Sequence, residues 1–79
     1  MKPYKPIDCN FYDYIEHFAT IGQQVEFIYL DKQFEEVTIQ TRIMDTENRG
    51  QLGEFILVEA VPDPIRMDRI IAIDGKRRP

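Results

Sequence analysis

The side chains with the clearest binding chemistry in this sequence are an aromatic ring and two carboxylates near the start of the chain. Tyr12, Asp13 and Glu16 lie within five consecutive positions. If this segment is helical, the three side chains share one face. An exposed aromatic ring beside two carboxylates has the composition of a docking surface for a basic partner.

Catalytic and metal chemistry are not indicated. Cys9 and His17 would lie about two helical turns apart, and no acid is placed to orient the histidine for a nucleophilic relay. One Cys and one His are too few for a zinc site. Asp63, Asp68 and Asp74 do not follow the spacing of a calcium loop. We therefore expect no enzyme activity, no metal and no cofactor, and we expect Cys9 to be a buried, packing thiol.

A helix over residues 10–22 is expected to carry the candidate docking residues. Before it, Pro3 and Pro6 predict an extended arm over residues 1–9, with Ile7 free to pack against the body. This arm would fix where the helix starts.

The ends and faces of the helix follow from its residue types. Asp8 and Asn10 are both candidate N-caps, and Asn10 is preferred because the apolar period begins directly after it. Gly22 suits a left-handed helix end. Asp13 and Glu16 fall in the first two turns, where the helix dipole favours negative charge. Offsets of three and four place Phe11, Tyr14, Ile15, Phe18 and Ile21 on the buried stripe, and Tyr12, Asp13, Glu16 and Thr20 on the outer face.

After Gly22 the sequence alternates with a period of two, which predicts β-strands over residues 24–74. In the second strand Val37, Ile39, Thr41 and Ile43 would point inward, and the direction would be antiparallel. The expected elements are a strand from residue 25 to 30, a turn at 31–33, a strand at 34–43, an exposed loop at 44–53, a strand at 54–61, a turn at 62–64, a further strand or bent strand at 65–74, and a disordered basic tail at 75–79.

One helix followed by four or five bent strands predicts a mainly β (α+β) fold, an N-terminal helix on a small Sm-like antiparallel barrel. The OB-fold is the main competitor, but its helix usually lies between the third and fourth strands. Periodicity alone leaves a generic β-sandwich open. The length of 79 residues allows one domain.

Charge and composition limit the partners. Residues 1–75 contain 14 acidic and 7 basic residues, so the body carries a formal charge of −7, whereas Lys76, Arg77 and Arg78 add +3. An acidic body repels phosphate, so we expect no direct nucleic-acid binding by it.

A single cysteine, no membrane-length apolar run and no apolar leader predict a cytoplasmic protein without a membrane span. We also expect a monomer, because the body is acidic and the helix can cover a sheet edge.

Three segments together resemble the Rho-binding antiterminator family, also called Rof. They are the opening cluster Tyr4, Pro6, Ile7, Cys9, Tyr12, Asp13, Ile15 and Glu16, the strand segment at residues 54–59 and the segment at residues 65–70. The resemblance extends from Tyr4 to about Asp74.

This resemblance implies a non-enzymatic inhibitor of the transcription termination factor Rho. It implies an N-terminal helix on an Sm-like barrel, bound to the N-terminal region of Rho that captures pyrimidine-rich single-stranded RNA. The family's helix contacts fall on Tyr12, Asp13 and Glu16 here. Asp8 and Asn10 are neighbouring candidates, and Asn48 and Arg49 are the candidates in the loop.

A small Sm-like RNA-binding protein is the alternative. In that case the basic tail and a local patch of Arg42, Arg49, Arg66 and Arg69 would contact nucleic acid despite the acidic total. An Sm-type RNA site would also be expected to have an Arg-Gly pair near the last strand, whereas Arg66 is followed by Met67.

Overall fold

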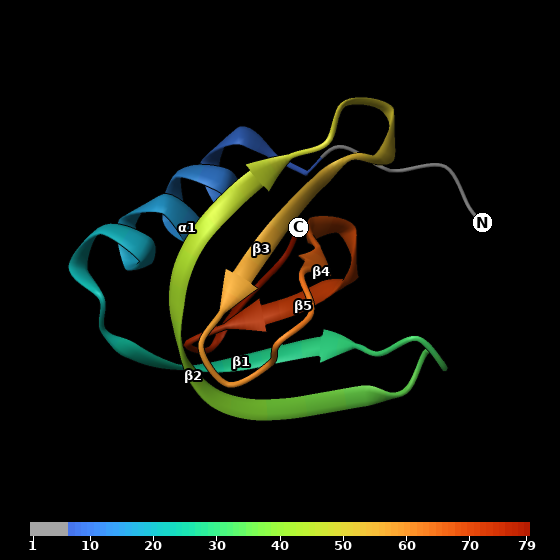
Figure 1. Ribbon diagram of the computed structural model, residues 1–79. Helices are drawn as coiled ribbons and strands as arrows, with labels where there is room; N and C mark the ends of the chain where they lie inside the picture. The colour runs from blue at the N-terminus through green and yellow to red at the C-terminus, as the bar shows by residue number, and fades with distance from the viewer. Residues whose placement is uncertain (1–6) are drawn as a thin grey trace.

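A computed structural model describes residues 7–79, and the predictions for Pro3, Tyr4 and Pro6 lie outside the described residues. Within these described residues the chain forms one α-helix followed by six short to medium strands (Figure 1). The elements are α1 (Cys9–Ile21), β1 (Gln24–Leu30), β2 (Glu36–Asn48), the 3₁₀ turn η1 (Gly50–Leu52), β3 (Glu54–Val58), β4 (Ile65–Arg66), the 3₁₀ turn η2 (Met67–Arg69), β5 (Ile70–Ile73) and β6 (Lys76–Arg77).

Helix α1 begins one residue earlier than predicted, and its N-cap is Asp8 rather than Asn10. An Asp8 carboxylate oxygen accepts a hydrogen bond from the Asn10 backbone N–H at 3.0 Å. The preference for Asn10 is therefore wrong, because Asn10 is already inside the first turn. The other end is as predicted: Gly22 adopts φ 65°, and its N–H donates to the Phe18 carbonyl at 3.0 Å.

The buried face of α1 is narrower than the predicted stripe. Phe11, Ile15 and Phe18 are buried in the core. Ile21, the last helical residue, is 49% exposed and does not belong to the core cluster. Cys9 is exposed as well, contrary to prediction. It precedes Phe11 by two positions, which places it roughly 200° around the helix from that ring.

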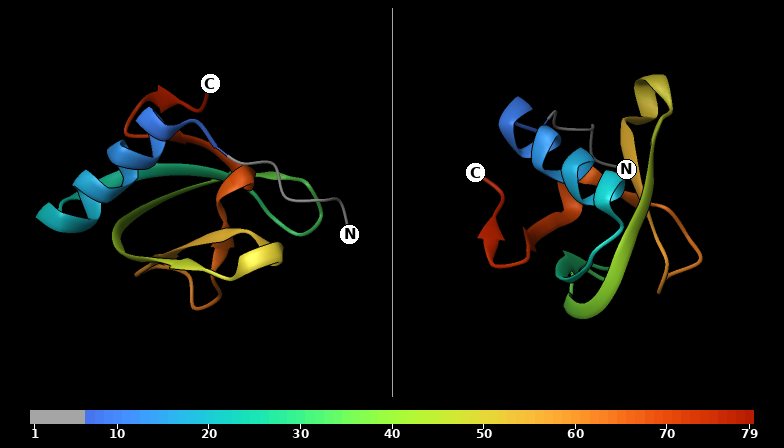
Figure 2. Two further views of the ribbon diagram at one scale, coloured as in Figure 1. Left: turned by 90° about the horizontal axis from the view of Figure 1, so that it is seen from above. Right: turned by 90° about the vertical axis from the view of Figure 1, so that its left-hand side faces the viewer.

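The strands form a single antiparallel sheet in the order β4-β3-β2-β1-β5-β6. Strands β4 and β6 are its two edges, so the sheet is open. The structure thus confirms a mainly β (α+β) fold with a leading helix, but not the predicted Sm-like barrel. Figure 2 shows the sheet curling around the core with α1 packed across it. The core residues shared by helix and sheet are Phe11, Ile15, Phe18, Val25, Phe27, Ile43, Ile56, Val58, Ile65, Met67, Ile70 and Ile73.

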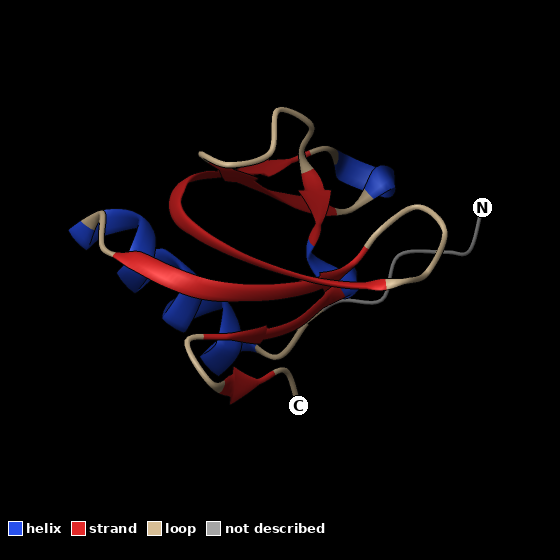
Figure 3. Cartoon of the chain, turned by 90° about the horizontal axis from the view of Figure 1, so that it is seen from below, coloured by secondary structure: helices blue, strands red, loops and turns tan. Residues whose placement is uncertain are grey.

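Strand β2 is the long, bent element that joins the two parts of the sheet (Figure 3). Its first half pairs with β1 and alternates between the two faces as predicted, with Thr41 and Ile43 buried. Its second half pairs with β3, after a register shift between Ile43 and Asp45. The predicted loop at 44–53 is therefore wrong over residues 44–48. Its polar residues do not break the strand, because an antiparallel sheet can keep one face in water.

Residues 54–74 also differ from the prediction. Strand β3 ends at Val58, three residues before the predicted end, and it pairs with β2 on one side and with β4 on the other. The predicted strand at 65–74 is divided by η2. Its first part, β4, pairs with β3, and its second part, β5, pairs with β1. The turn η2 thus carries the chain from one part of the sheet to the other.

The basic tail is an ordered part of the sheet, so the prediction of disorder at residues 75–79 is wrong. Asp74 and Gly75 have φ values of 51° and 86°, and Ile73 pairs with Lys76 across them. Two consecutive residues with positive φ are typical of a type I′ hairpin. The Arg78 N–H donates to the Ile71 carbonyl at 2.8 Å and extends the pairing.

Candidate functional site

Helix α1 presents two carboxylates to solvent. Asp13 and Glu16 are three positions apart and both exposed, whereas Phe11 and Ile15, between and beside them in sequence, are buried. The helical period separates the two sets. We call Asp13 and Glu16 the acidic helix face.

Among residues 7–79, no ion pair explains these two carboxylates. Neither forms an ion pair with another residue of the described chain. The first turn of α1 contains no acidic residue, so Asp13 and Glu16 lie beyond the part of the helix where the dipole acts most strongly. The helix contains no Lys or Arg. The acidic helix face is therefore available to a partner.

Tyr12 does not lie on this open face as predicted. Its side chain is half-buried and packs against the core. Its hydroxyl lies 3.5 Å from the Thr46 hydroxyl on β2. The ring is at the border between helix and sheet, because β2 extends further than predicted and covers this side of α1. Tyr12 can offer a partner one edge of its ring at most.

The neighbouring polar candidates have structural contacts of their own. The Asp8 carboxylate caps α1. The Asn48 side-chain oxygen accepts a hydrogen bond from the Gly50 N–H at 2.8 Å and shapes the turn after β2. Asn10 is exposed in the first turn of the helix. Of these three, only Asn10 has a side chain without a hydrogen bond to another described residue.

Arg49 is separated from the acidic helix face by the sheet. Its Nε donates to Glu47 Oε1 at 2.9 Å, and its guanidinium carbon lies 4.7 Å from the centre of the Phe55 ring. Glu47 is the cross-strand partner of Phe55. The residue before Glu47, Thr46, faces α1. Alternation along β2 therefore places Glu47 and its partner Phe55 on the other face of the sheet, and Arg49 lies with them through its contacts with both. The hydrogen bond to Glu47 raises the pKa of the Arg49 guanidinium further.

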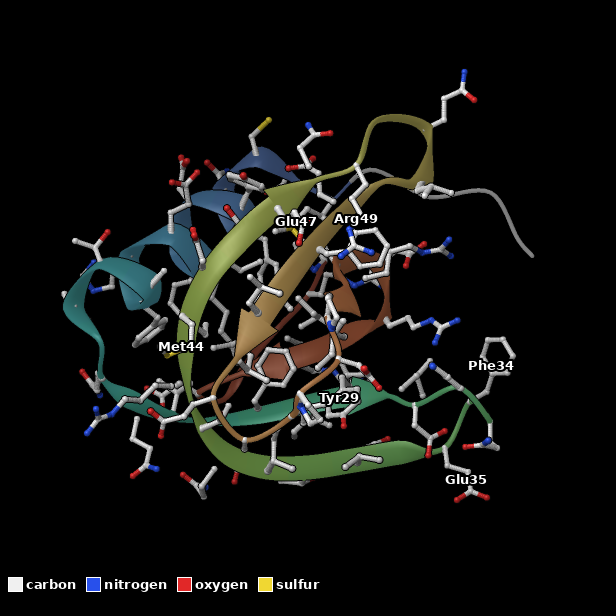
Figure 4. The ribbon with its side chains drawn as sticks, in the orientation of Figure 1. Tyr29, Phe34, Glu35, Met44, Glu47 and Arg49 are labelled. Atoms are coloured by element: carbon white, nitrogen blue, oxygen red, sulfur yellow. The ribbon has the colours of Figure 1, made fainter. Side chains whose placement is uncertain are left out.

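A groove of about 610 Å³ includes Arg49 and Phe55 in its lining, together with Tyr29 and Val61, which pack against the core. It is lined by the end of β1, the β1–β2 turn, the turn after β2, strand β3, the β3–β4 connection and η2. Figure 4 shows Tyr29, Phe34 and Arg49 to the right of the upper part of β2, with α1 to its left. The lining residues with binding chemistry are Tyr29, Lys32, Arg49, Phe55, Arg66 and Arg69.

Comparison with known protein families, curated proteins and solved structures gave no match. The assignment of function therefore depends on the site itself and on the resemblance noted in the sequence.

The groove contains three arginines of the patch predicted for RNA binding. Arg49, Arg66 and Arg69 line it, whereas Arg42 is exposed elsewhere on β2. Lys32, Tyr29 and Phe55 were not identified from the sequence as site residues. They come from three separate segments, and no local pattern joins them.

A third region of interest is the contact of α1 with the β5–β6 hairpin. The Tyr14 hydroxyl donates to the Ile73 carbonyl at 3.2 Å, and Lys76 Nζ lies 4.8 Å from the centre of the Tyr14 ring. Burial raises the pKa of Tyr14 above its ordinary 10.0, and the negative charge of Asp74 adds to this. Lys76 and Arg78 thus serve the packing of the hairpin, since the Arg78 Nε also donates to the Ile70 carbonyl at 2.7 Å.

Within residues 7–79 there is no cluster of His, Cys, Asp and Glu that could hold a metal ion. No helix in the same part of the chain is long and apolar enough to cross a membrane.

Proposed function

We propose that this protein is a non-enzymatic antiterminator that binds the N-terminal RNA-binding region of the termination factor Rho through the acidic helix face. The observation that carries the proposal is the exposed pair Asp13 and Glu16, which has no ion partner among the described residues. The identity of the partner rests on the resemblance to the Rho-binding antiterminator family. The Sm-like class of the sheet and a cytoplasmic location belong to the same proposal.

The chemistry of such an encounter is complementary. A protein groove that captures single-stranded RNA carries Lys and Arg along the path of the phosphates. Carboxylates that pair with those cations occupy the same positions as the phosphates and exclude RNA. Charge pairing of this kind accelerates association at low salt and weakens as salt rises.

The helix needs no ordering on binding. Phe11, Ile15 and Phe18 fasten it to the sheet in the free protein, and its two ends are capped. Asp13 and Glu16 are therefore held in place before the partner arrives, which lowers the entropic cost of association.

The test is displacement of a fluorescent oligopyrimidine from Rho by the intact protein. The variant carries Asp13→Lys and Glu16→Lys together. We expect its displacing power to fall at least about 100-fold, because two attractive charge pairs become repulsive. Its unfolding curve should match that of the wild type, since both positions are exposed.

A matched control reverses two exposed acids away from the helix, Glu36→Lys on β2 and Glu59→Lys after β3. It produces the same change in net charge and should displace RNA nearly as well as the wild type. If both double variants lose displacement equally, the effect comes from net charge and the acidic helix face is not the docking site. If the wild-type protein does not displace RNA, the proposed function is wrong.

A further inference from the structure

We infer that the groove lined by Arg49 and Phe55 is a nucleotide-binding site that takes a base together with its phosphate, either as a free mononucleotide or as part of a single-stranded RNA. This site is distinct from the acidic helix face, and its existence does not depend on the proposed function.

The groove is lined by more cations than carboxylates, although the protein as a whole is acidic. Its lining includes four cations, Lys32, Arg49, Arg66 and Arg69, and two carboxylates, Asp31 and Asp63. The lining is thus +2, whereas the whole chain is −4 and its remainder −6. Because Glu47 and Asp68 pair with Arg49 and Arg66, the lining and its ion partners together are neutral, which repels an anionic ligand less than the rest of this acidic surface does.

Not all of these charges are equally available. Arg49 pairs with Glu47, and Arg66 pairs with Asp68 at 2.8 Å. Lys32 and Arg69 have no ion pair with a described residue. The Asp31 carboxylate is engaged by the backbone N–H groups of Gln33 and Glu35 at 2.8 and 3.0 Å. Lys32 and Arg69 are therefore the cations that we assign to the phosphate.

The groove also has surfaces on which a base can stack. The Arg49 guanidinium lies over the Phe55 ring, and the Arg69 guanidinium lies 5.8 Å from the centre of the Phe34 ring. Aromatic rings and guanidinium planes are the usual platforms for unstacked bases. Carboxylate peptides need cations but not flat platforms, so this combination favours a nucleotide over an acidic peptide.

Phe34, beside the groove, is a further indication of a binding site. It is 63% exposed, a large apolar side chain directly after the lining residues Lys32 and Gln33. Its φ of 61° is unfavourable for a bulky residue. Residues with a strained backbone are concentrated at functional sites. The groove volume of about 610 Å³ is within the range of roughly 300 to 1,000 Å³ found for small-ligand sites.

The experiment titrates the isolated full chain with three probes: uridine monophosphate, a labelled oligouridylate and a glutamate-rich peptide. Binding is followed by calorimetry and by amide chemical shifts. We expect saturable binding of a nucleotide probe, with the largest shifts at Lys32, Phe34 and Arg69. Binding of the mononucleotide identifies a free nucleotide as the source, and binding of the oligomer alone identifies RNA.

The test variant is Lys32→Gln with Arg69→Gln, and its control is Arg42→Gln with Arg77→Gln. Both lose two positive charges, but Arg42 and Arg77 are exposed outside the groove. We expect the first to weaken binding at least about tenfold and the second less than about threefold. The inference is wrong if neither nucleotide probe binds, if both variants lose binding equally, or if only the acidic peptide binds. Because Rho is absent from the assay, these outcomes do not bear on the proposed function.

Discussion

The acidic helix face and the groove are built in opposite ways. Asp13 and Glu16 stand on one regular helix, and neither has an ion partner in the described chain. The groove is assembled from several turns and strand ends, and two of its four cations are already ion-paired. A surface on one helix can be predicted from local periodicity, whereas a groove of distant segments depends on how the sheet curls. The comparison also predicts that the two surfaces can be disabled separately.

Loss of the packing that holds α1 on the sheet should have the largest effect on the protein. Phe18→Ala should destabilise the protein by about 3 to 5 kcal/mol, because Phe18 is 6% exposed in the shared core. Ile21→Ala is the matched control from the same predicted stripe, and it should cost less than about 1 kcal/mol because Ile21 is 49% exposed. Urea unfolding measures both. Equal costs would mean that α1 is not packed as described.

A change in the β1–β2 turn should affect the groove and spare the helix. Asp31→Ala removes the acceptor of two backbone N–H groups, Gln33 and Glu35. We expect a loss of about 1 to 2 kcal/mol and weaker nucleotide binding, with Rho docking of the folded protein unchanged. Asp31→Asn keeps the accepting oxygen and should restore most of the stability. No rescue by Asn would contradict the role of this side chain in the turn.

Removal of the N-cap of α1 should cost less stability than the change at Asp31. Asp8→Ala removes the N-cap and should cost about 1 kcal/mol, and Asn10→Ala should cost less than about 0.5 kcal/mol. Thermal unfolding of the two variants decides between them. A larger loss of stability in Asn10→Ala would mean that Asn10, the residue preferred from the sequence, is the N-cap. Nucleotide binding in the groove should be unaffected by either change.

The smallest expected effect concerns the contact between α1 and the β5–β6 hairpin. The pKa of Tyr14 is raised in the folded protein by burial and by Asp74, so folding favours the protonated phenol. This contribution to stability is complete below the ordinary pKa of 10.0 and is lost as the pH rises through the folded value. Tyr14→Phe should therefore flatten the fall in melting temperature above pH 10.0. An unchanged alkaline slope would contradict this account of Tyr14.

The sequence predicted the elements governed by local chemistry. The αL end at Gly22, the buried Phe11, Ile15 and Phe18, and the alternation of the first half of β2 are as expected. The exposure of Asp13 and Glu16 followed from the same helical period. These features depend on neighbours within a few residues, and single-sequence patterns record such neighbours well.

The errors have two different origins. The polar residues 45–48 were predicted as part of a loop because composition cannot show that β3 pairs with them. Tyr12 was predicted to lie on the open face of the helix, but the longer β2 reaches its ring. The order of the tail was predictable in principle, because Asp74-Gly75 is a strong hairpin signal and its significance was missed.

The central claim, that the two surfaces bind different partners independently, is tested most directly by measuring two variants in two assays. The variants are Asp13→Lys with Glu16→Lys at the helix, and Lys32→Gln with Arg69→Gln in the groove. The assays are displacement of oligopyrimidine from Rho and binding of uridine nucleotides to the isolated protein. We expect the helix variant to lose the first activity alone and the groove variant to lose the second alone. If either folded variant loses both activities, or if each loses neither, the division of the molecule into two sites is contradicted.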